Sequence, residues 1–307
     1  LVKTNSSSLD YDQINKQFVV IEREKQLAVW YTAMDLEKHI CSGPLLKSLP
    51  QTRYPSLSND GKSLAFASTS NGIDSLWRRD LKNNNVVLLY QAETSESLSE
   101  PTWSPDGKKL MVSLLAKDNS RILQIDLELG DVRDFARNNN AKMGKWSPDG
   151  KQMYWYEQVG DNWFIMQKEL ANKEIKQVLY QPISRFEVAR NNRLYYQKIG
   201  SFQVLTKDLN DLDGEQVSDS LYLDLKGGFE WQIQEDDFYY VSLMPIQKKF
   251  GLFKKNLSSG ETQSLYPVSA MTSVDTGRHL AVSLDGRNAF YTKMEQYRTQ
   301  VSLLKRK

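Results

Sequence analysis

Few residues in this 307-residue chain could perform acid–base or nucleophilic chemistry, since it holds two histidines and one cysteine. No Gly-x-Ser-x-Gly elbow accompanies His39 or His279, so the sequence gives no sign of an α/β-hydrolase nucleophile. The motifs His-Glu-x-x-His and Gly-x-x-x-x-Gly-Lys-Ser/Thr are also absent. Because no spacing groups a nucleophile, a base and an orienting acid, we predict no catalytic residues and a protein that is not an enzyme.

Metal binding has two weak candidates in the sequence. His39 and Cys41 stand two residues apart and would share one face of a strand, but a structural zinc site needs four ligands. Several Asp-Gly pairs could suggest calcium, yet one carboxylate per turn is too few for an ion that takes six or more oxygens. We therefore expect no metal and no cofactor.

Five charged residues are candidates for a binding site, and the sign of the charge differs from one to another. They stand just before the first strand that we predict in each unit of a repeating pattern described below. Non-repeating charges at a repeating place are typical of a binding face, although a solvated rim would also place charges there. We predict that five residues ring the mouth of a central channel and contact a ligand or partner there: Arg53, Glu100, Lys145, Glu187 and Glu230.

The repeating pattern is a phrase centred on a Pro-Asp-Gly turn. Gly permits a positive φ in such a turn, and Asp can bond its own backbone two residues on. A strand precedes each turn and an apolar, aromatic run follows it. The phrase reads Tyr-Pro-Ser-Leu-Ser-Asn-Asp-Gly-Lys at 54–62, Pro-Thr-Trp-Ser-Pro-Asp-Gly-Lys at 101–108, Trp-Ser-Pro-Asp-Gly-Lys at 146–151 and Ser-Leu-Asp-Gly-Arg at 283–287.

A second landmark gives the period, because each unit carries a strand that ends in a polar residue followed by leucine. A less regular seventh strand closes the chain at 300–304. Spacings of roughly 45 residues are the signature of a repeat architecture. The landmark leucines are Leu36, Leu81, Leu127, Leu170, Leu209 and Leu257.

Four short strands per unit, repeated, predict an all-β fold, a single β-propeller over 1–307 with almost no helix. Seven landmarks predict seven blades; six is the alternative, because the first unit lacks a clear Asp-Gly turn. The last unit lacks a fourth strand, so we expect the N-terminal segment, either 1–12 or the strand just after it, to pair with the last blade and close the ring. The predicted blades are roughly 13–50, 51–97, 98–140, 141–184, 185–222, 223–270 and 271–307.

Bulk composition narrows the setting. The net charge of +2 supplies no field that would collect nucleic acid, and we predict no direct nucleic-acid binding. A single cysteine excludes a disulfide within the chain, which suits a reducing compartment or a bacterial envelope protein without bridges. No apolar run approaches the ~20 residues of a membrane span. The first eight residues read as a linker, so we expect a piece of a longer protein.

The Trp-Ser-Pro-Asp-Gly-Lys phrase resembles the TolB-like propeller repeat, most strongly at 54–67, 101–115 and 146–156. Such repeats occur in TolB itself, in propellers that gate prolyl-oligopeptidase and dipeptidyl-peptidase types of peptidase, and in the extracytoplasmic half of membrane-bound regulators of the ToxR/CadC kind. The closing phrase Ser-Leu-Asp-Gly-Arg-Asn-Ala-Phe-Tyr-Thr-Lys resembles the ends of those regulators. The resemblance is specific for the propeller and leaves the function open.

The resemblance implies a periplasmic binding or sensing module. The first hypothesis is the sensor domain of a membrane-anchored transcription regulator, attached to the membrane only through a preceding segment. Its partner would be a small molecule or an envelope protein at the channel mouth. A propeller that gates a peptidase and a TolB-like envelope scaffold are the alternatives. An upstream winged helix and apolar span would select the first hypothesis, and a downstream hydrolase domain would select the second.

Overall fold

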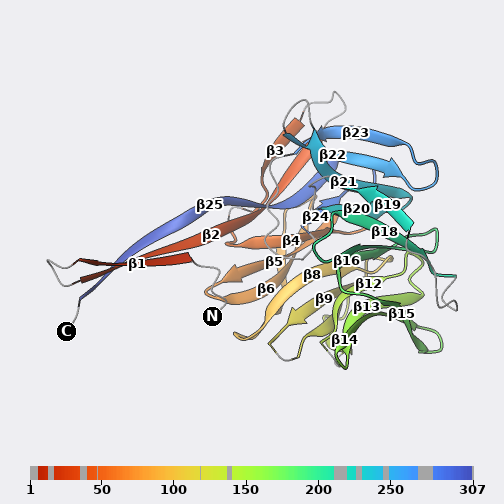
Figure 1. Ribbon diagram of the computed structural model, residues 1–307, viewed down its shortest axis with the longest axis horizontal. Coiled ribbons are helices and arrows are strands. Elements are labelled where there is room, and N and C mark those ends of the chain that lie inside the picture. The colour runs from red at the N-terminus through yellow and green to blue at the C-terminus, as the bar shows by residue number, and fades with distance from the viewer. Residues whose placement is uncertain are drawn as a thin grey trace.

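The computed structural model describes the backbone of residues 6–12, 17–34, 40–46, 48–117, 119–136, 140–210, 220–225, 230–244, 249–268 and 279–305. Side chains are described from residue 26 onward within these ranges, except at 40–42, 220–222, 224 and 294–305. The described elements are β-strands joined by turns, and they form six sheets arranged as the blades of a propeller (Figure 1). The predicted all-β propeller is therefore confirmed, with six blades.

Five blades are antiparallel sheets of four strands that follow one another along the chain. Apolar residues, many of them aromatic, occupy the buried positions of their second and third strands, as suits a pleated and mostly buried surface. The strands are β4 (Thr52–Leu57), β5 (Ser63–Ser70), β6 (Ile73–Asp80) and β7 (Val86–Gln91); β8 (Ser97–Trp103), β9 (Lys109–Leu115), β10 (Arg121–Asp126) and β11 (Val132–Ala136); β12 (Lys142–Trp146), β13 (Gln152–Val159), β14 (Asn162–Glu169) and β15 (Ile175–Tyr180); β16 (Ile183–Val188), β17 (Arg193–Lys198), β18 (Gln203–Asp208) and β19 (Ser220–Asp224); β20 (Trp231–Gln234), β21 (Asp237–Met244), β22 (Lys249–Asn256) and β23 (Thr262–Pro267).

The sixth blade joins the two ends of the chain, as predicted. Its strands follow the order β24 (Leu280–Val282), β25 (Asn288–Lys305), β2 (Gln17–Met34) and β3 (Ile40–Pro44). The long antiparallel pair β2–β25 supplies the ring closure. Such pairing satisfies backbone groups that would otherwise form an open sheet edge.

The prediction of seven blades was wrong, because the first and last units were counted separately. β2 ends at Met34, just before the first landmark leucine in the sequence, and the seventh landmark lies within β25. These two strands are neighbours in one sheet. Units 13–50 and 271–307 therefore contribute strands to a single blade. The partner of the C-terminal strand is β2, the strand just after 1–12, whereas β1 (Ser6–Asp12) pairs with β2 alone.

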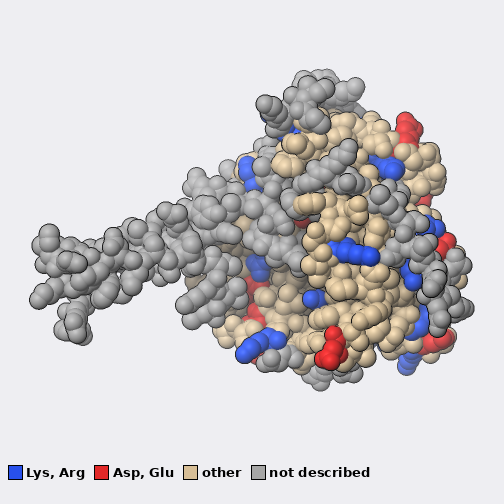
Figure 2. All heavy atoms as spheres, viewed as in Figure 1, with Lys and Arg blue, Asp and Glu red and all other residues tan. Residues whose placement is uncertain are grey.

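β1 and the distal parts of β2 and β25 form a three-stranded ribbon that projects from the ring (Figure 1). Its register pairs Leu9 with Val20 and Val20 with Ser302. No helix among the described residues has the length and apolar character to cross a membrane. The described charges on the face seen in Figure 2 are scattered and of both signs.

The repeated phrase forms the same turn in four blades, as at Asp106. The Ser104 hydroxyl donates to the Asp106 carboxylate at 2.5 Å, and the Lys108 backbone N–H donates to the same oxygen at 3.0 Å. Gly107 has a φ of 72°, which the turn requires. These bonds, the serine one first, lower the pKa of Asp106. The equivalent serine–aspartate bonds are Ser58–Asp60, Ser147–Asp149 and Ser283–Asp285.

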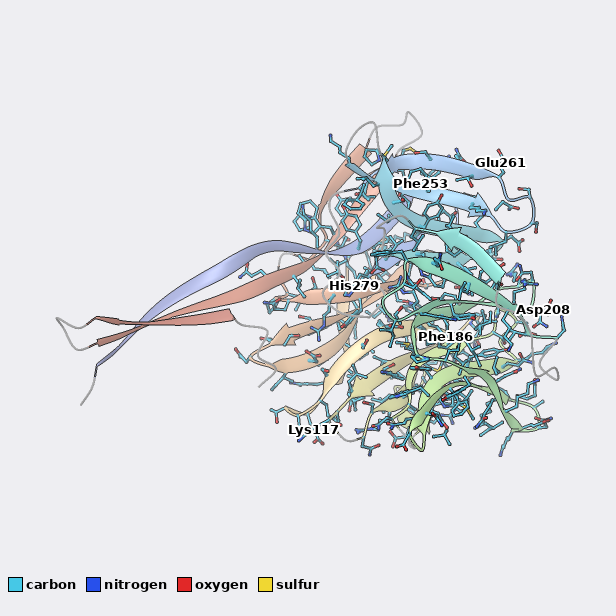
Figure 3. The ribbon with its side chains drawn as sticks, viewed as in Figure 1. Lys117, Phe186, Asp208, Phe253, Glu261 and His279 are labelled. Carbon is cyan, nitrogen blue, oxygen red and sulfur yellow. The ribbon has the colours of Figure 1, made fainter. Side chains whose placement is uncertain are left out.

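The hydrophobic core lies between neighbouring blades. One cluster joins Leu76 of β6 to Leu98 and Leu110 of the next blade. The Trp103 indole donates to the Ser56 carbonyl oxygen at 2.9 Å, which ties β8 to β4. Side chains fill the interior of the ring, and Glu261 stands at its outer edge (Figure 3). Burial of this kind is the largest stabilising term and holds the inner strands in place.

Candidate functional site at the ring axis

The inner strands β4, β8 and β12 carry a bulge at the same repeat position. In β12, Lys142 pairs with Tyr156 and Lys145 with Tyr154, so β12 holds one extra residue. β4 and β8 shift register in the same way. A bulge changes the direction in which side chains point, and here it brings them toward the ring axis. The residues with positive φ at this bulge are Tyr54 at 55°, Glu100 at 50° and Met143 at 58°.

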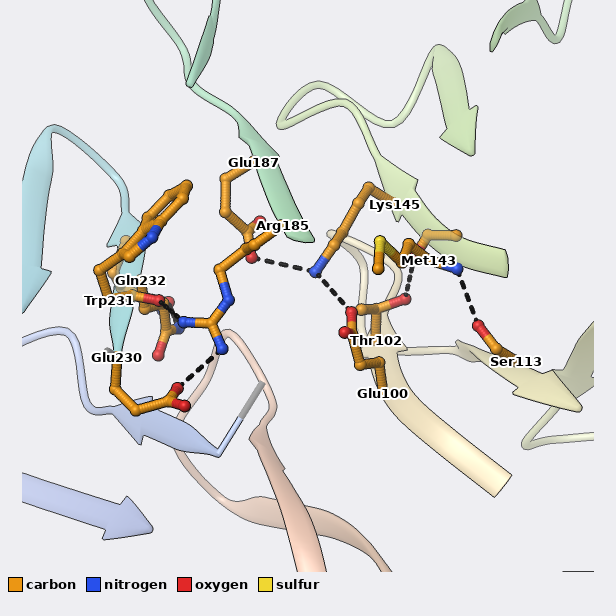
Figure 4. A network of polar contacts seen from close by, with 12 residues as sticks. Glu100, Thr102, Ser113, Met143, Lys145, Arg185, Glu187, Glu230, Trp231 and Gln232 are labelled. Atoms are coloured by element: carbon orange, nitrogen blue, oxygen red, sulfur yellow. Dashed lines mark hydrogen bonds and ion pairs between the residues drawn. The ribbon is translucent and has the colours of Figure 1, made fainter. Parts of the chain in front are cut away.

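Three of the predicted site residues meet across three blades (Figure 4). The Lys145 Nζ lies 3.0 Å from Glu187 Oε1 and 3.6 Å from Glu100 Oε2. Their side chains are 4%, 12% and 4% exposed, respectively. The attraction between the cation and the two carboxylates offsets part of the cost of removing all three charges from water. We call this group the axial triad.

Glu230 belongs to a second buried group. Its Oε2 accepts hydrogen bonds from Arg185 Nη2 at 2.8 Å and from the His279 backbone N–H at 3.0 Å. Arg185 Nη1 also donates to the Trp231 carbonyl oxygen at 3.2 Å (Figure 4). The fully buried ring of His279 lies 4.9 Å from that of Tyr54. Four blades therefore contribute to this group, which spans the axis beside the axial triad.

Arg53 is not brought together with the other four residues. Its guanidinium forms an ion pair with Asp74 of β6 and a hydrogen bond to Thr69, both in its own blade. Asp74 also accepts a 2.8 Å hydrogen bond from the Leu98 backbone N–H of the next blade. The physical reason is depth along the strand, because Arg53 precedes the bulge whereas Lys145 and Glu187 follow it.

A funnel of about 260 Å³ opens at the Asp-Gly turn end of the axis. Inner strands of five blades line it, and Lys145 and Glu187 lie at its base. Trp103 and Trp146 contribute to its walls, and an ion pair between Arg190 and Glu235 stands at its exposed rim. Concave sites with a few fixed polar groups are where proteins hold ligands. We call this cavity the axial funnel.

Sequence reasoning missed the partners of the predicted residues. Arg185 and His279 were not selected, although counting back from the turn places them level with Glu100 and Glu230. The signal available in the sequence is the number of residues between each of them and the turn. It can be used only when the first strand of each blade is aligned through its pairing with the second strand. No group of three or more potential metal ligands occurs among the described residues. His39 lies outside the described residues, as does the side chain of Cys41.

No family model and no curated protein matches the chain. Solved propellers do match it. A putative TolB from Agrobacterium tumefaciens is 16% identical with a TM-score of 0.59, over 89% of this chain and 99% of that one. TolB from Acinetobacter baumannii is also 16% identical, with a TM-score of 0.55, over 83% of this chain and 65% of that chain's length. The propeller domain of the Trilobed protease from Pyrococcus furiosus is 14% identical with a TM-score of 0.50, over 95% and 97%. These likenesses show a TolB-like propeller fold.

Proposed function

We propose that this chain is a non-enzymatic binding module and that the axial funnel is its binding surface. The observation that carries the proposal is the base of the funnel, where Lys145 and Glu187 are already paired and nearly dehydrated. Fixed charges in a water-poor recess lose little side-chain freedom when a partner binds. A charged side chain or chain end of a partner protein, or a small charged molecule, would meet both signs there.

The proposed setting is extracytoplasmic, as the sensor half of a membrane-anchored transcription regulator. Support comes from the resemblance of the closing phrase at 283–293 to such regulators. The full-length gene product tests this setting. An upstream winged-helix domain and one apolar span of ~20 residues would agree with it. A downstream hydrolase domain would instead favour the peptidase gate, and neither feature would favour the envelope scaffold.

Charge reversal at the funnel rim tests the binding surface. The double variant Arg190→Glu/Glu235→Arg keeps an exposed ion pair but reverses its direction. Lys108→Glu/Glu128→Lys reverses an exposed pair that does not line the funnel, and serves as the matched control. The immobilised chain is exposed to an envelope extract, and bound material is quantified by mass spectrometry.

We expect the rim reversal to reduce capture of the bound partner by tenfold or more, while the control reversal leaves it unchanged. Equal capture by all three chains would refute the funnel as the binding surface. The non-enzymatic part is tested separately with fluorogenic peptide and ester substrates. Turnover that disappears on replacing one serine or His279 would overturn it.

A further inference from the structure

A second cavity of about 310 Å³ lies between the β8–β11 and β12–β15 blades. It opens where β8, β10 and β12 begin, which is the end of the blades away from the Asp-Gly turns. Its lining includes the charged residues Glu100, Lys117 and Lys142, the ring of Trp163, and the polar residues Ser99 and Ser120. A cavity of this volume is at the lower end of the range for small-molecule sites. We call it the inter-blade pocket.

Lys142 brings a positive charge to this pocket without a carboxylate. Its Nζ lies 4.4 Å from the ring centroid of Trp163 and 5.6 Å from that of Tyr156. Among the described residues, none forms an ion pair or hydrogen bond with this ammonium. Burial lowers the pKa of Lys142, and the more distant Glu100 opposes that shift only in part. The three N–H donors of the ammonium are thus available to a ligand.

Glu100 brings a negative charge to the same pocket. Its side chain is 4% exposed, and its one ion-pair partner in the described part of the chain is Lys145 at 3.6 Å. That separation exceeds the length of a charge-assisted hydrogen bond, which is about 2.7–2.9 Å. The carboxylate therefore retains acceptor capacity, and Glu100 is among the residues that line the pocket.

Lys117 also lines the pocket, but it is exposed to solvent, so the less exposed Lys142 and Glu100 are the charges that restrict the ligand. A simple anion would be attracted by Lys142 and repelled by Glu100, and a polyamine would experience the reverse. A neutral sugar would need a free aromatic face, but the Trp163 indole is already stacked on Tyr156 at 4.8 Å and contacted by Lys142. A molecule that carries one carboxylate and one ammonium satisfies both groups.

We propose that the inter-blade pocket binds a small zwitterion, namely a free α-amino acid, with its carboxylate on Lys142 and its ammonium on Glu100. Ser99 and Ser120 line the same wall and supply further hydroxyl groups. The bound ammonium would stand one contact from Lys145 and hence from the base of the axial funnel. The proposal does not depend on the function proposed for the funnel.

Isothermal titration calorimetry on the full chain tests the pocket, with each of the twenty L-amino acids as probes. The methyl ester and the N-acetyl derivative of any binder then remove the carboxylate charge and the ammonium charge in turn. Lys142→Met removes the cation and keeps an apolar stem against Trp163. Lys168→Met is the matched control, because Lys168 lies over the ring of Phe135 outside the pocket.

We expect at least one amino acid to bind, and both derivatives to bind tenfold or more weakly. Lys142→Met should weaken binding to the same extent, and Lys168→Met should leave it unchanged. Absence of binding for all twenty at millimolar concentration would overturn the proposal, as would derivatives that bind equally well. Unchanged affinity in Lys142→Met, with an intact thermal melt, would also overturn it. The funnel-rim reversal should not alter amino-acid affinity, so failure of one site is distinguishable from failure of the other.

Discussion

The β4–β7 and β12–β15 blades place a cation at the same repeat position but surround it with different side chains. Arg53 and Lys142 each precede the bulge of their inner strand. The residue that faces Arg53 from the third strand is Asp74, whereas the equivalent residue beside Lys142 is Trp163. Arg53 therefore has a carboxylate in its own blade, and Lys142 has aromatic rings.

We call a cation closed when it is paired with a buried carboxylate, and open when it contacts aromatic rings and lines a cavity. The two blades differ in this respect. Arg53 and Lys145 are neutralised by buried carboxylates, so they contribute to holding the ring together. Lys142 has the ring of Trp163 at the place of that carboxylate, and it lines the inter-blade pocket. The proposed inter-blade site therefore lies where one blade departs from its equivalents.

Removal of the cation of the axial triad should lower the stability of the protein more than the other substitutions considered below. Lys145→Met leaves Glu100 and Glu187 buried without a counter-charge, so we expect the free energy of unfolding to fall by about 3–5 kcal/mol. Urea denaturation of the variant and the parent measures this loss. Lys62→Met is the control, because Lys62 is 77% exposed and its loss should change stability by no more than about 0.5 kcal/mol. Equal effects in the two variants would show that burial of the triad is not what stabilises it.

Removing the carboxylate that closes the Arg53 position should have the next largest effect. Asp74→Asn removes the charge facing Arg53 and weakens the bond from the Leu98 N–H, so we expect a loss of about 2–4 kcal/mol. Thermal and urea denaturation measure it. A variant as stable as the parent would mean that Arg53 is solvated and that this position is not closed.

Removing the open cation should change stability least. Lys142→Met removes an ammonium that has no carboxylate to leave behind, and methionine keeps contact with Trp163 and Tyr156. We expect the free energy of unfolding to change by no more than about 1 kcal/mol, the size of a cation–π contact. A loss as large as that of Asp74→Asn would place Lys142 among the closed charges.

The repeating parts of the fold could be predicted from the sequence because their bonds are local. The turn at Asp106 is made by residues within a few positions of it, so its phrase is visible in the chain. The number of blades could not be predicted in this way. β2 and β25 pair across nearly the whole chain, and the landmarks count the two ends of the chain as separate units. Counting landmarks cannot tell two blades from one blade shared by both ends.

The candidate site could be predicted only in part. Charge at a repeating place selected Glu100, Lys145 and Glu187, which do meet. The bulge that sets their depth depends on strand register, and the choice of partner depends on contacts such as Arg185–Glu230, 45 residues apart. Arg53 was grouped with them because it is also charged, although it lies before the bulge of its strand and pairs within its own blade.

The ammonium pKa of Lys142 tests most directly whether its position is open. NMR titration of lysine-labelled, ligand-free chain reports each side chain, and Lys142→Met assigns the signal in question. Lys108 is an internal reference, because its hydrogen bond to Glu128 raises its pKa. We predict that Lys142 titrates below the ordinary lysine value of about 10.4 and below Lys108. A pKa for Lys142 equal to or above that of Lys108 would contradict the account, because a carboxylate would then be neutralising it.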